Sequence, residues 1–333
     1  MNISVIIPAF NVEKYLEKAV KSVVDFPEVR ELIIIDDGSH DSTLNLCLKL
    51  KEENPKIKIF QHPERKNKGV SASRNLGINM ATGDFIAFLD ADDFYLPNRF
   101  EAEKIIFHEK PIVDGIYGAI SAHFITQLGK KRFSQAKMRE LTTISGSPPP
   151  EELLYVLLGD SQEYRGHFSL DALTVRKTIF NKSGLFDENL EFGEDTDLII
   201  RMAATGILVA GMTEQPVAMR GVHDENRVTN TKKLDSSRAV LYNKLYIWGG
   251  DNAMPERARS LCLKKSLVKR TYNDSFFDGL KFLLTLKKNY PDLRADPISY
   301  REIVFGVFGN NLFSKIYLKI IKLTDKNKLS VQR

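Results

Sequence analysis

Along the first 120 residues, the arrangement of apolar and polar positions switches repeatedly between two patterns. Short, continuously apolar runs rich in Val, Ile and Phe are typical of buried strands, whereas apolar positions spaced three or four apart are typical of helices. The expected strands are residues 3–7, 31–35, 56–60, 85–89 and 114–120, and the expected helices are 12–26, 42–54, 71–81 and 96–110. Buried strands that alternate with helices predict an α/β fold with a mostly parallel, Rossmann-like sheet and helices on both faces.

The pattern changes further along the chain. Residues 121–170 are harder to assign, although the segment 145–154 ("SGSPPPEELL") predicts a loop that leads into a helix. Residues 171–222 return to a mixed α/β pattern, and beyond them the pattern becomes mainly helical. We therefore expect an α/β domain at residues 1–230 and a mainly helical C-terminal extension at residues 235–333.

Charge is distributed unevenly along the chain. The net charge is +5, and the composition of 43% hydrophobic and 27% charged residues is ordinary for a globular protein. Residues 261–333 hold 15 Lys or Arg and 6 Asp or Glu, so the rest of the chain is slightly acidic. A nucleic-acid-binding body would be expected to be basic, and we therefore expect no nucleic-acid partner.

The sequence favours a cytoplasmic location. The two cysteines, Cys47 and Cys262, match no metal-binding spacing and suit a reducing compartment. The N-terminal segment reaches Pro8 after a short apolar run with no basic residues, so we expect no signal peptide. No run approaches 18 uninterrupted apolar residues, so we expect no transmembrane helix.

Three carboxylates follow the expected strand at 85–89. Asp90, Asp92 and Asp93 stand at its carboxyl end, which is where ligands bind in parallel α/β sheets. Mg²⁺ and Mn²⁺ prefer oxygen ligands and are commonly bound by one or two carboxylates together with substrate phosphates. A helix cap would account for one of these aspartates but not for three, so the pattern favours a metal and phosphate site.

Two further acidic clusters have simpler alternatives. Asp36 and Asp37, in "DDGS", end a neighbouring strand and could form only a turn. Glu194 and Asp195, in "FGEDTDLIIRM", precede an apolar helix, where acids are favoured by the helix dipole. Alternatively, Asp37 accepts hydrogen bonds from a nucleotide, and a carboxylate at the helix start serves as a general base.

Four segments together carry a resemblance to a known family. They are "SVIIPAFNVEKYLEKAVKSV", "ELIIIDDGSHDST", "NKGVSASRNLGINMATGDFIAFLDADD" and "GLFDENLEFGEDTDLIIR". In this order and spacing they resemble the family-2 inverting glycosyltransferases, which have the A-type nucleotide-sugar transferase fold. The resemblance covers roughly residues 1–225 and does not include the C-terminal extension.

The resemblance implies roles for individual residues. The nucleotide, usually UDP, is expected at Pro8, Ala9, Phe10, Asp37, Arg74 and Asp90, with Asp90 on the ribose. Asp92 is expected to bind Mn²⁺ or Mg²⁺ at the diphosphate, and His223 to complete the metal shell or contact the diphosphate. Asp195 is expected to be the catalytic base. For Arg74, a structural ion pair is an equal alternative, and a lone histidine such as His223 is often merely structural.

The implied activity is transfer of a sugar from a UDP donor to a glycan or lipid-linked acceptor in cell-surface polysaccharide synthesis, by a hexosyl- or N-acetylhexosaminyltransferase. Residues 1–120 would bind the nucleotide sugar and residues 121–230 the acceptor. The candidate acceptor residues are His167, Asp171 and Glu194. The alternatives are a catalytically silent sugar-nucleotide-binding subunit and a D-x-D phosphohydrolase, although Phe94 and Tyr95 stand where the latter needs a small hydroxyl residue.

The basic C-terminal extension has two interpretations. Residues 311–328 place lysines at helical spacing among Ile, Leu and Phe. Such a helix could lie on an anionic membrane surface, as a peripheral contact at the inner face of the plasma membrane. It could equally pack its apolar side on the domain and leave its lysines in solvent.

Overall fold

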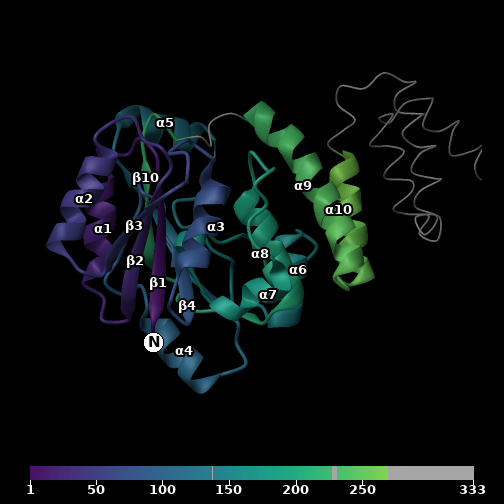
Figure 1. Cartoon of the computed structure of the whole chain (residues 1–333). Coiled ribbons are helices and arrows are strands. Elements are labelled where there is room, and N and C mark those ends of the chain that lie inside the picture. Colours follow the sequence, from purple (N-terminus) through teal and green to yellow (C-terminus); the bar gives the residue numbers. More distant parts are fainter. Residues whose placement is uncertain (137, 227–230, 269–333) are drawn as a thin grey trace, which may run out of the picture. The chain divides into compact units, whose positions relative to one another are not determined.

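The computed structural model describes residues 1–136, 138–226 and 231–268 (Figure 1). The chain divides into two compact units, one ending at residue 230 and the other beginning at Thr231. The expected division of the first unit into donor and acceptor halves near residue 120 stays a prediction.

The first unit is built on a seven-stranded sheet with the strand order β3-β2-β1-β4-β8-β6-β9. The strands are β1 (Ile3–Ala9), β2 (Val29–Asp36), β3 (Ile57–Gln61), β4 (Phe85–Phe88), β6 (Gly115–Tyr117), β8 (Leu173–Arg176) and β9 (Leu208–Ala210). Strand β8 runs antiparallel to its neighbours, β4 and β6, whereas the other neighbouring pairs of this sheet are parallel. The prediction of a mostly parallel α/β sheet is therefore confirmed.

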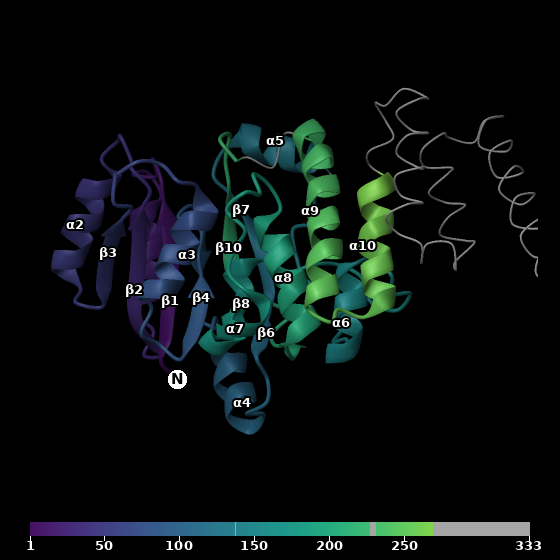
Figure 2. The same cartoon turned by 45° about the vertical axis from the view of Figure 1, so that its right-hand side comes forward.

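Helices lie on both faces of this sheet (Figures 1 and 2). The helices of the first unit are α1 (Leu16–Val24), α2 (Thr43–Glu53), α3 (Val70–Met80), α4 (Glu101–Glu109), α5 (Gln127–Gln135), α6 (Pro150–Leu157), α7 (Phe180–Ser183) and α8 (Glu194–Thr205). Along β1, Ile3, Val5 and Ile7 join the core formed with α1. Ile6 points to the opposite face and lies against Gly77 of α3, where an added Cβ would be 2.5 Å from its side chain.

A second, three-stranded sheet was not predicted. It has the order β5-β10-β7, formed by Phe94–Tyr95, Pro216–Val222 and Ala119–Phe124. The single strand expected at 114–120 is wrong, because the chain leaves the large sheet after β6 and enters the small one as β7. The small sheet pairs β10 with the residues that directly follow Asp93, and so brings the end of β10 to the D-x-D loop (Asp90–Asp93).

The second unit is helical where it is described. Its helices α9 (Thr231–Asp251) and α10 (Glu256–Val268) pack together and bury Leu241, Leu245, Ala258, Cys262 and Leu263. Among the described helices, none is both long and apolar enough to cross a membrane. The amphipathic helix expected at 311–328 lies outside the described residues.

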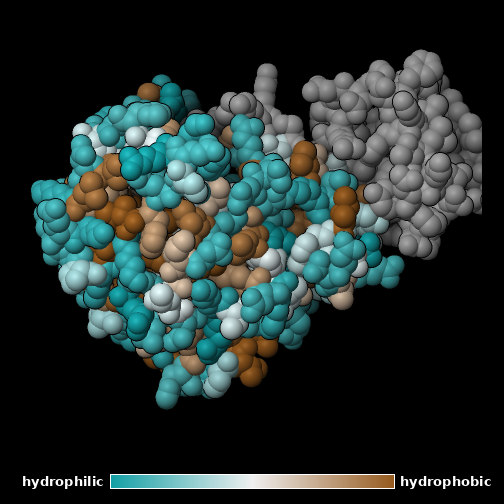
Figure 3. Space-filling view, in the orientation of Figure 1, coloured by the Kyte–Doolittle hydropathy of each residue, from teal (hydrophilic) through white to brown (hydrophobic). Residues whose placement is uncertain are grey.

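Hydrophilic side chains cover most of the face of the first unit that Figure 3 shows, with apolar patches between them. Phe10 is one of the large apolar side chains that stay exposed, with 40% of its surface accessible at the end of β1. Its ring meets His40 edge to face, with 6.2 Å between the ring centroids. An exposed aromatic ring at a strand end is well suited to pack on a flat ligand.

Candidate active site

The ends of β1, β2 and β4 bring the predicted nucleotide-binding residues to one edge of the sheet. The strands are parallel neighbours, with Ala9 paired to Asp36 and Ile6 paired to Phe88. Asp37 N donates to Ala9 O at 2.8 Å, which links the ends of β1 and β2 directly. The two predicted carboxylate clusters therefore lie at the same edge, as expected for a ligand site in an α/β fold.

Asp37 is buried and holds the loop that precedes α3. Its carboxylate accepts hydrogen bonds from Lys68 N at 2.7 Å and Gly69 N at 2.9 Å, and His62 Nε2 lies 3.5 Å away. Burial raises the pKa of Asp37, and these backbone hydrogen bonds oppose the shift. Asp37 therefore fixes the loop that precedes α3 at this edge of the sheet.

Asp90 and Glu194 share one guanidinium. Arg74 Nη2 lies 2.7 Å from Asp90 Oδ1, and Arg74 Nη1 lies 3.3 Å from Glu194 Oε1. Burial disfavours the charge on Arg74, but the two carboxylates outweigh it and raise the pKa. Arg74 is only 4% exposed. It forms structural ion pairs, which were the alternative to the predicted contact with the nucleotide.

Asp92 and His223 come together as the metal prediction requires. His223 Nε2 lies 3.0 Å from Asp92 Oδ2, and Asn226 Nδ2 donates to the same oxygen at 3.3 Å. The hydrogen bond to Asp92 raises the pKa of His223, against the effect of burial. Tyr15 stacks on the imidazole with 4.6 Å between ring centroids, which fixes its plane.

Asp93 holds the D-x-D loop to β10. Its Oδ1 accepts a hydrogen bond from Gly221 N at 2.8 Å. A Cβ added to Gly221 would lie 2.2 Å from Asp92 O, so only glycine lets the strand pass this close to the loop. Burial raises the pKa of Asp93 well above its usual range, and the neighbouring aspartates add to the shift.

Asp171, predicted to face the acceptor, lies under the D-x-D loop and is 3% exposed. Its Oδ1 accepts from Asp90 N at 3.0 Å, and its Oδ2 accepts from Ser169 Oγ at 2.6 Å. Burial raises its pKa, and the charge of Asp90 adds to the effect. Arg99, which is fully buried, donates to Asp171 O at 2.9 Å and fixes the backbone there.

Carboxylate oxygens of Asp90, Asp93 and Asp171 lie within 4.8 Å of one another, close enough to hold a metal ion. Oxygen ligands of this kind suit a hard divalent cation. Asp92 and His223 form a second pair beside them, and the side chain of Asp92 is 27% exposed. The chemistry of the donor atoms at this edge therefore fits Mg²⁺ or Mn²⁺.

Asp195 and His167 lie in more open positions. Asp195 is the second residue of α8, is half-buried, and its Oδ1 accepts from Thr196 N at 2.6 Å. The helix dipole favours acidic residues at a helix N-terminus, as the simpler alternative for this cluster states. His167 is exposed on the loop before β8.

Sequence reasoning assigned no role to four residues that help to hold the site together, namely Tyr15, Asn226, Ser169 and Arg99, and it placed Asn75 only within a segment that resembles the family near the nucleotide. Asn75 and Arg99 gave a partial signal, since each is a polar residue within a segment expected to be a helix. Asn75 contacts Glu188, 113 positions away, and Arg99 contacts Asp171, 72 positions away, so no local pattern identifies these contacts, although Arg99 also pairs with Glu103 four positions along the chain.

The fold and the sequence motifs are those of a glycosyltransferase with the A-type fold. Residues 4–160 match the family model described as glycosyl transferase family 2. The segment 4–160 is therefore a domain of this family, as the sequence motifs predict.

Named relatives agree with this classification. An uncharacterized glycosyltransferase of Rickettsia conorii is 32% identical over 61% of this chain and 30% of its own length. The minor teichoic acid biosynthesis protein GgaA of Bacillus subtilis is 29% identical over 99% of this chain and 68% of its own length. The chain spans between 16% and 40% of the first four curated relatives that it matches.

Solved structures show the same fold. The crystal structure of S. aureus TarS 1-349 in complex with UDP-GlcNAc matches with a TM-score of 0.57 and 17% sequence identity. The match covers 92% of this chain and 82% of that chain. At this level of identity the likeness shows the fold, which is that expected from the sequence motifs.

Proposed function

We propose that this chain is an inverting glycosyltransferase that moves a hexosyl or N-acetylhexosaminyl group from a UDP-sugar to a cell-surface glycan or its lipid-linked precursor. The observation that carries the proposal is the Arg74 bridge, which places the D-x-D loop next to the helix start that bears Asp195. The UDP-GlcNAc complex of TarS and the teichoic acid role in the name of GgaA support the donor and the acceptor class.

On the donor side, the proposed nucleotide site is formed by Pro8, Ala9, Phe10, Asp37, Arg74 and Asp90. The exposed ring of Phe10 would pack on the base, and Asp37 would accept from it. Asp90, whose side chain is 45% exposed while Arg74 fixes one of its oxygens, would accept from the ribose hydroxyls. These contacts would hold the donor across the ends of β1, β2 and β4.

Asp92 and His223 are the proposed ligands of Mn²⁺ or Mg²⁺. Asp93 and Asp171 are less accessible for this role, because Asp93 accepts a hydrogen bond from Gly221 N, and Asp171 accepts from Asp90 N and Ser169 Oγ. A bound divalent cation supplies positive charge that neutralises the leaving diphosphate. Tyr15 and Asn226 would keep His223 and Asp92 in place during the reaction.

Asp195 is the proposed general base. Its carboxylate would take the proton of the acceptor hydroxyl while that oxygen attacks the anomeric carbon from the face opposite the diphosphate. A single displacement of this kind needs one base and inverts the anomeric centre, without a second carboxylate as nucleophile. Glu194 would orient the base by its ion pair to Arg74.

The acceptor is proposed to bind in the half formed by residues 121–230, where His167 is exposed and Glu194 lies at the start of α8. A lipid-linked acceptor would place the protein at the inner face of the plasma membrane. We propose the basic C-terminal extension, residues 235–333, as the peripheral contact, because the net positive charge of the chain is concentrated there.

A donor screen tests the proposed function. The melting temperature of the full chain is measured with Mn²⁺ and one of UDP, UDP-glucose, UDP-galactose, UDP-GlcNAc or UDP-GalNAc, with CDP and GDP as controls. Release of UDP from the sugar donors is then measured. A ligand at 100 times its Kd stabilises the folded state by about 2.7 kcal/mol, which raises the melting temperature. Stabilisation by UDP and release of UDP from at least one sugar donor are expected. Equal stabilisation by all nucleotides, or binding without any turnover, contradicts the proposal.

A further inference from the structure

Two consecutive buried residues of α3 reach across to the segment that leads into the base-bearing helix. Arg74 is 4% exposed and Asn75 is 6% exposed, so both side chains are held within the protein. Each has a partner in residues 186–194, more than 100 positions further along the chain. This pair therefore joins the nucleotide-binding edge to the residues around Asp195.

Arg74 makes the first connection. One terminal nitrogen lies on Asp90 and the other on Glu194, the residue next to Asp195. Its guanidinium also lies over the ring of Phe186, 5.3 Å from the centroid. Because the planar guanidinium is held at three points, it fixes both the distance between these groups and their relative orientation. The flexible ammonium group of a lysine would not fix the orientation.

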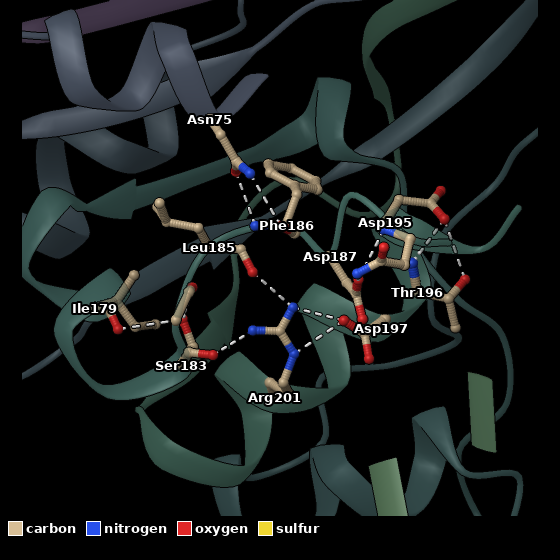
Figure 4. Close-up of polar contacts among 12 residues, drawn as sticks. Asn75, Ile179, Ser183, Leu185, Phe186, Asp187, Asp195, Thr196, Asp197 and Arg201 are labelled. Atoms are coloured by element: carbon tan, nitrogen blue, oxygen red, sulfur yellow. Dashed lines mark hydrogen bonds and ion pairs between the residues drawn. The ribbon is translucent and has the colours of Figure 1, made fainter. Parts of the chain in front are cut away.

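Asn75 makes the second connection (Figure 4). Its amide donates to Phe186 O at 3.0 Å and accepts from Phe186 N at 2.9 Å, so it holds both backbone groups of one residue. The same nitrogen also lies 2.9 Å from Glu188 Oε1. Buried hydrogen bonds of this kind are costly to break, because the freed groups have no water to replace the lost partner.

The opposite side of this segment is held by α8 itself. Arg201 donates to Ser183 O and to Leu185 O, and forms an ion pair with Asp197 (Figure 4). Residues 183–188 therefore lie between Arg201 on one side and Asn75 on the other. The segment that leads into α8 is thereby held between α3 and α8. The start of α8, which carries Asp195, is therefore fixed relative to α3.

We propose that Arg74 and Asn75 are positioning residues that set the placement of the base Asp195 relative to the donor-binding residue Asp90. The inference rests on the proposed function, since it needs Asp195 as base and Asp90 on the donor. The reacting groups must be held close and aligned, and a displacement of about 1 Å can cost about 10²-fold in rate. Both residues stand on a helix that packs on the central strand β1, which makes a rigid support.

Asn75→Ala is the main test variant, because the hydrogen bonds of Asn75 go to Phe186 and Glu188 rather than to Asp90 or Asp195. Asn79→Ala is the matched control, since Asn79 is exposed one turn further along α3. Hydrogen exchange of the full chain without ligand is measured first. Faster exchange in residues 184–197 of Asn75→Ala, with unchanged exchange in residues 29–36, is expected. Exchange in residues 184–197 equal to that of the control overturns the proposal.

Kinetics provide the second test, with UDP-GlcNAc as the donor and Mn²⁺ present. Asn75→Ala is expected to keep the Kd for UDP and the KM for the donor within about 3-fold, and to lose about 10²-fold in kcat. Arg74→Lys, which keeps the charge but not the planar fork, is expected to lose about 10-fold in kcat. A loss of UDP affinity with unchanged kcat overturns the positioning role and favours direct nucleotide contact.

The two tests separate the two proposals. The exchange measurement needs no donor, so it decides whether Asn75 holds the base-bearing segment even if the wild-type chain transfers no sugar. Turnover by the wild type together with unchanged exchange in Asn75→Ala would leave the proposed function standing and remove the positioning role. If Asn75→Ala does not fold, Arg74→Lys is compared with Asn79→Ala in both measurements.

Discussion

The imidazole of His223 and the carboxylate of Asp92 lie 3.0 Å apart, although 131 positions separate them in the chain. The end of β10 brings His223 to the D-x-D loop, and Tyr15 from the start of the chain covers the imidazole ring. Three distant segments thus meet at the proposed metal ligands. We therefore expect the proposed donor site to depend on His223, from the proposed acceptor half, for its completion.

Asp92→Ala is expected to abolish the part of UDP binding that requires Mn²⁺, because the variant lacks the proposed ligand. His223→Ala is expected to weaken that binding by roughly 10-fold to 100-fold, the range typical for residues that support or complete a metal site. Calorimetric titration of UDP with and without Mn²⁺ measures both. His108→Ala, on the exposed side of α4, is the control. Binding by Asp92→Ala that matches the wild type would remove Asp92 from the metal site.

Removal of divalent cations is expected to stop transfer, since the leaving diphosphate would lose its neutralising charge. The protein is treated with excess EDTA, desalted and assayed for UDP release, and Mn²⁺ or Mg²⁺ is then added back. Recovery on addition of either ion is the expected result. Full activity in excess EDTA would show that the diphosphate is neutralised by protein side chains alone.

Asp195→Asn is expected to bind UDP as the wild type does and to lose transfer by about 10²-fold to 10⁴-fold, the range for general-base catalysis. The amide keeps the shape of the side chain but cannot accept the proton. Asp25→Asn, at the exposed end of α1, is the matched control. Turnover of Asp195→Asn within a few-fold of the control would mean that another group is the base.

Asp171→Ala is expected to weaken binding of UDP with Mn²⁺ and to lower the melting temperature, because Asp171 holds the backbone N–H of Asp90. A residue that bound only the acceptor would instead raise the KM for the acceptor and leave UDP binding intact. Titration of UDP and acceptor kinetics on the same variant distinguish the two roles.

Glu31→Gln is expected to lower the free energy of unfolding by about 2 kcal/mol at pH 7, because a buried charged acceptor of several hydrogen bonds becomes neutral. The residue is 1% exposed, and the partners of its carboxylate are Lys58, Ser4 and Thr82. Burial alone would raise the pKa of Glu31, but these hydrogen bonds outweigh it and lower the pKa to about 2.

The same carboxylate predicts a pH dependence. Since the folded-state pKa lies below the ordinary value of 4.5, its stabilising effect is present above that pH and is lost as the pH falls toward 2. The difference in stability between the wild type and Glu31→Gln should therefore shrink as the pH falls from about 7 to about 3. Denaturant-induced unfolding at several pH values measures this difference in stability. The control is Glu17→Gln, on the exposed side of α1. A difference that does not change with pH would show that the charge of Glu31 is not its source.

The sequence was sufficient to predict the elements whose signal is local. Buried strands such as β1 and β4 are continuous apolar runs, so the acidic edge at Asp90–Asp93 could be located from the amino-acid pattern alone. The split of residues 114–120 between two sheets could not be predicted, because both parts are equally apolar and differ only in their distant partners. The burial of Asp171 was missed for the same reason, since its hydrogen-bond partner Asp90 lies 81 positions away in the chain.

The close passage of β10 under the D-x-D loop restricts how such proteins can be recombined. Any residue larger than glycine at position 221 would push its side chain into Asp92 O. Two positions later, His223 must still reach the carboxylate of the same aspartate. A chimaera that joins residues 1–120 of this chain, the proposed nucleotide-binding half, to the corresponding second half of another protein should therefore keep glycine and histidine at this spacing, whatever else is exchanged.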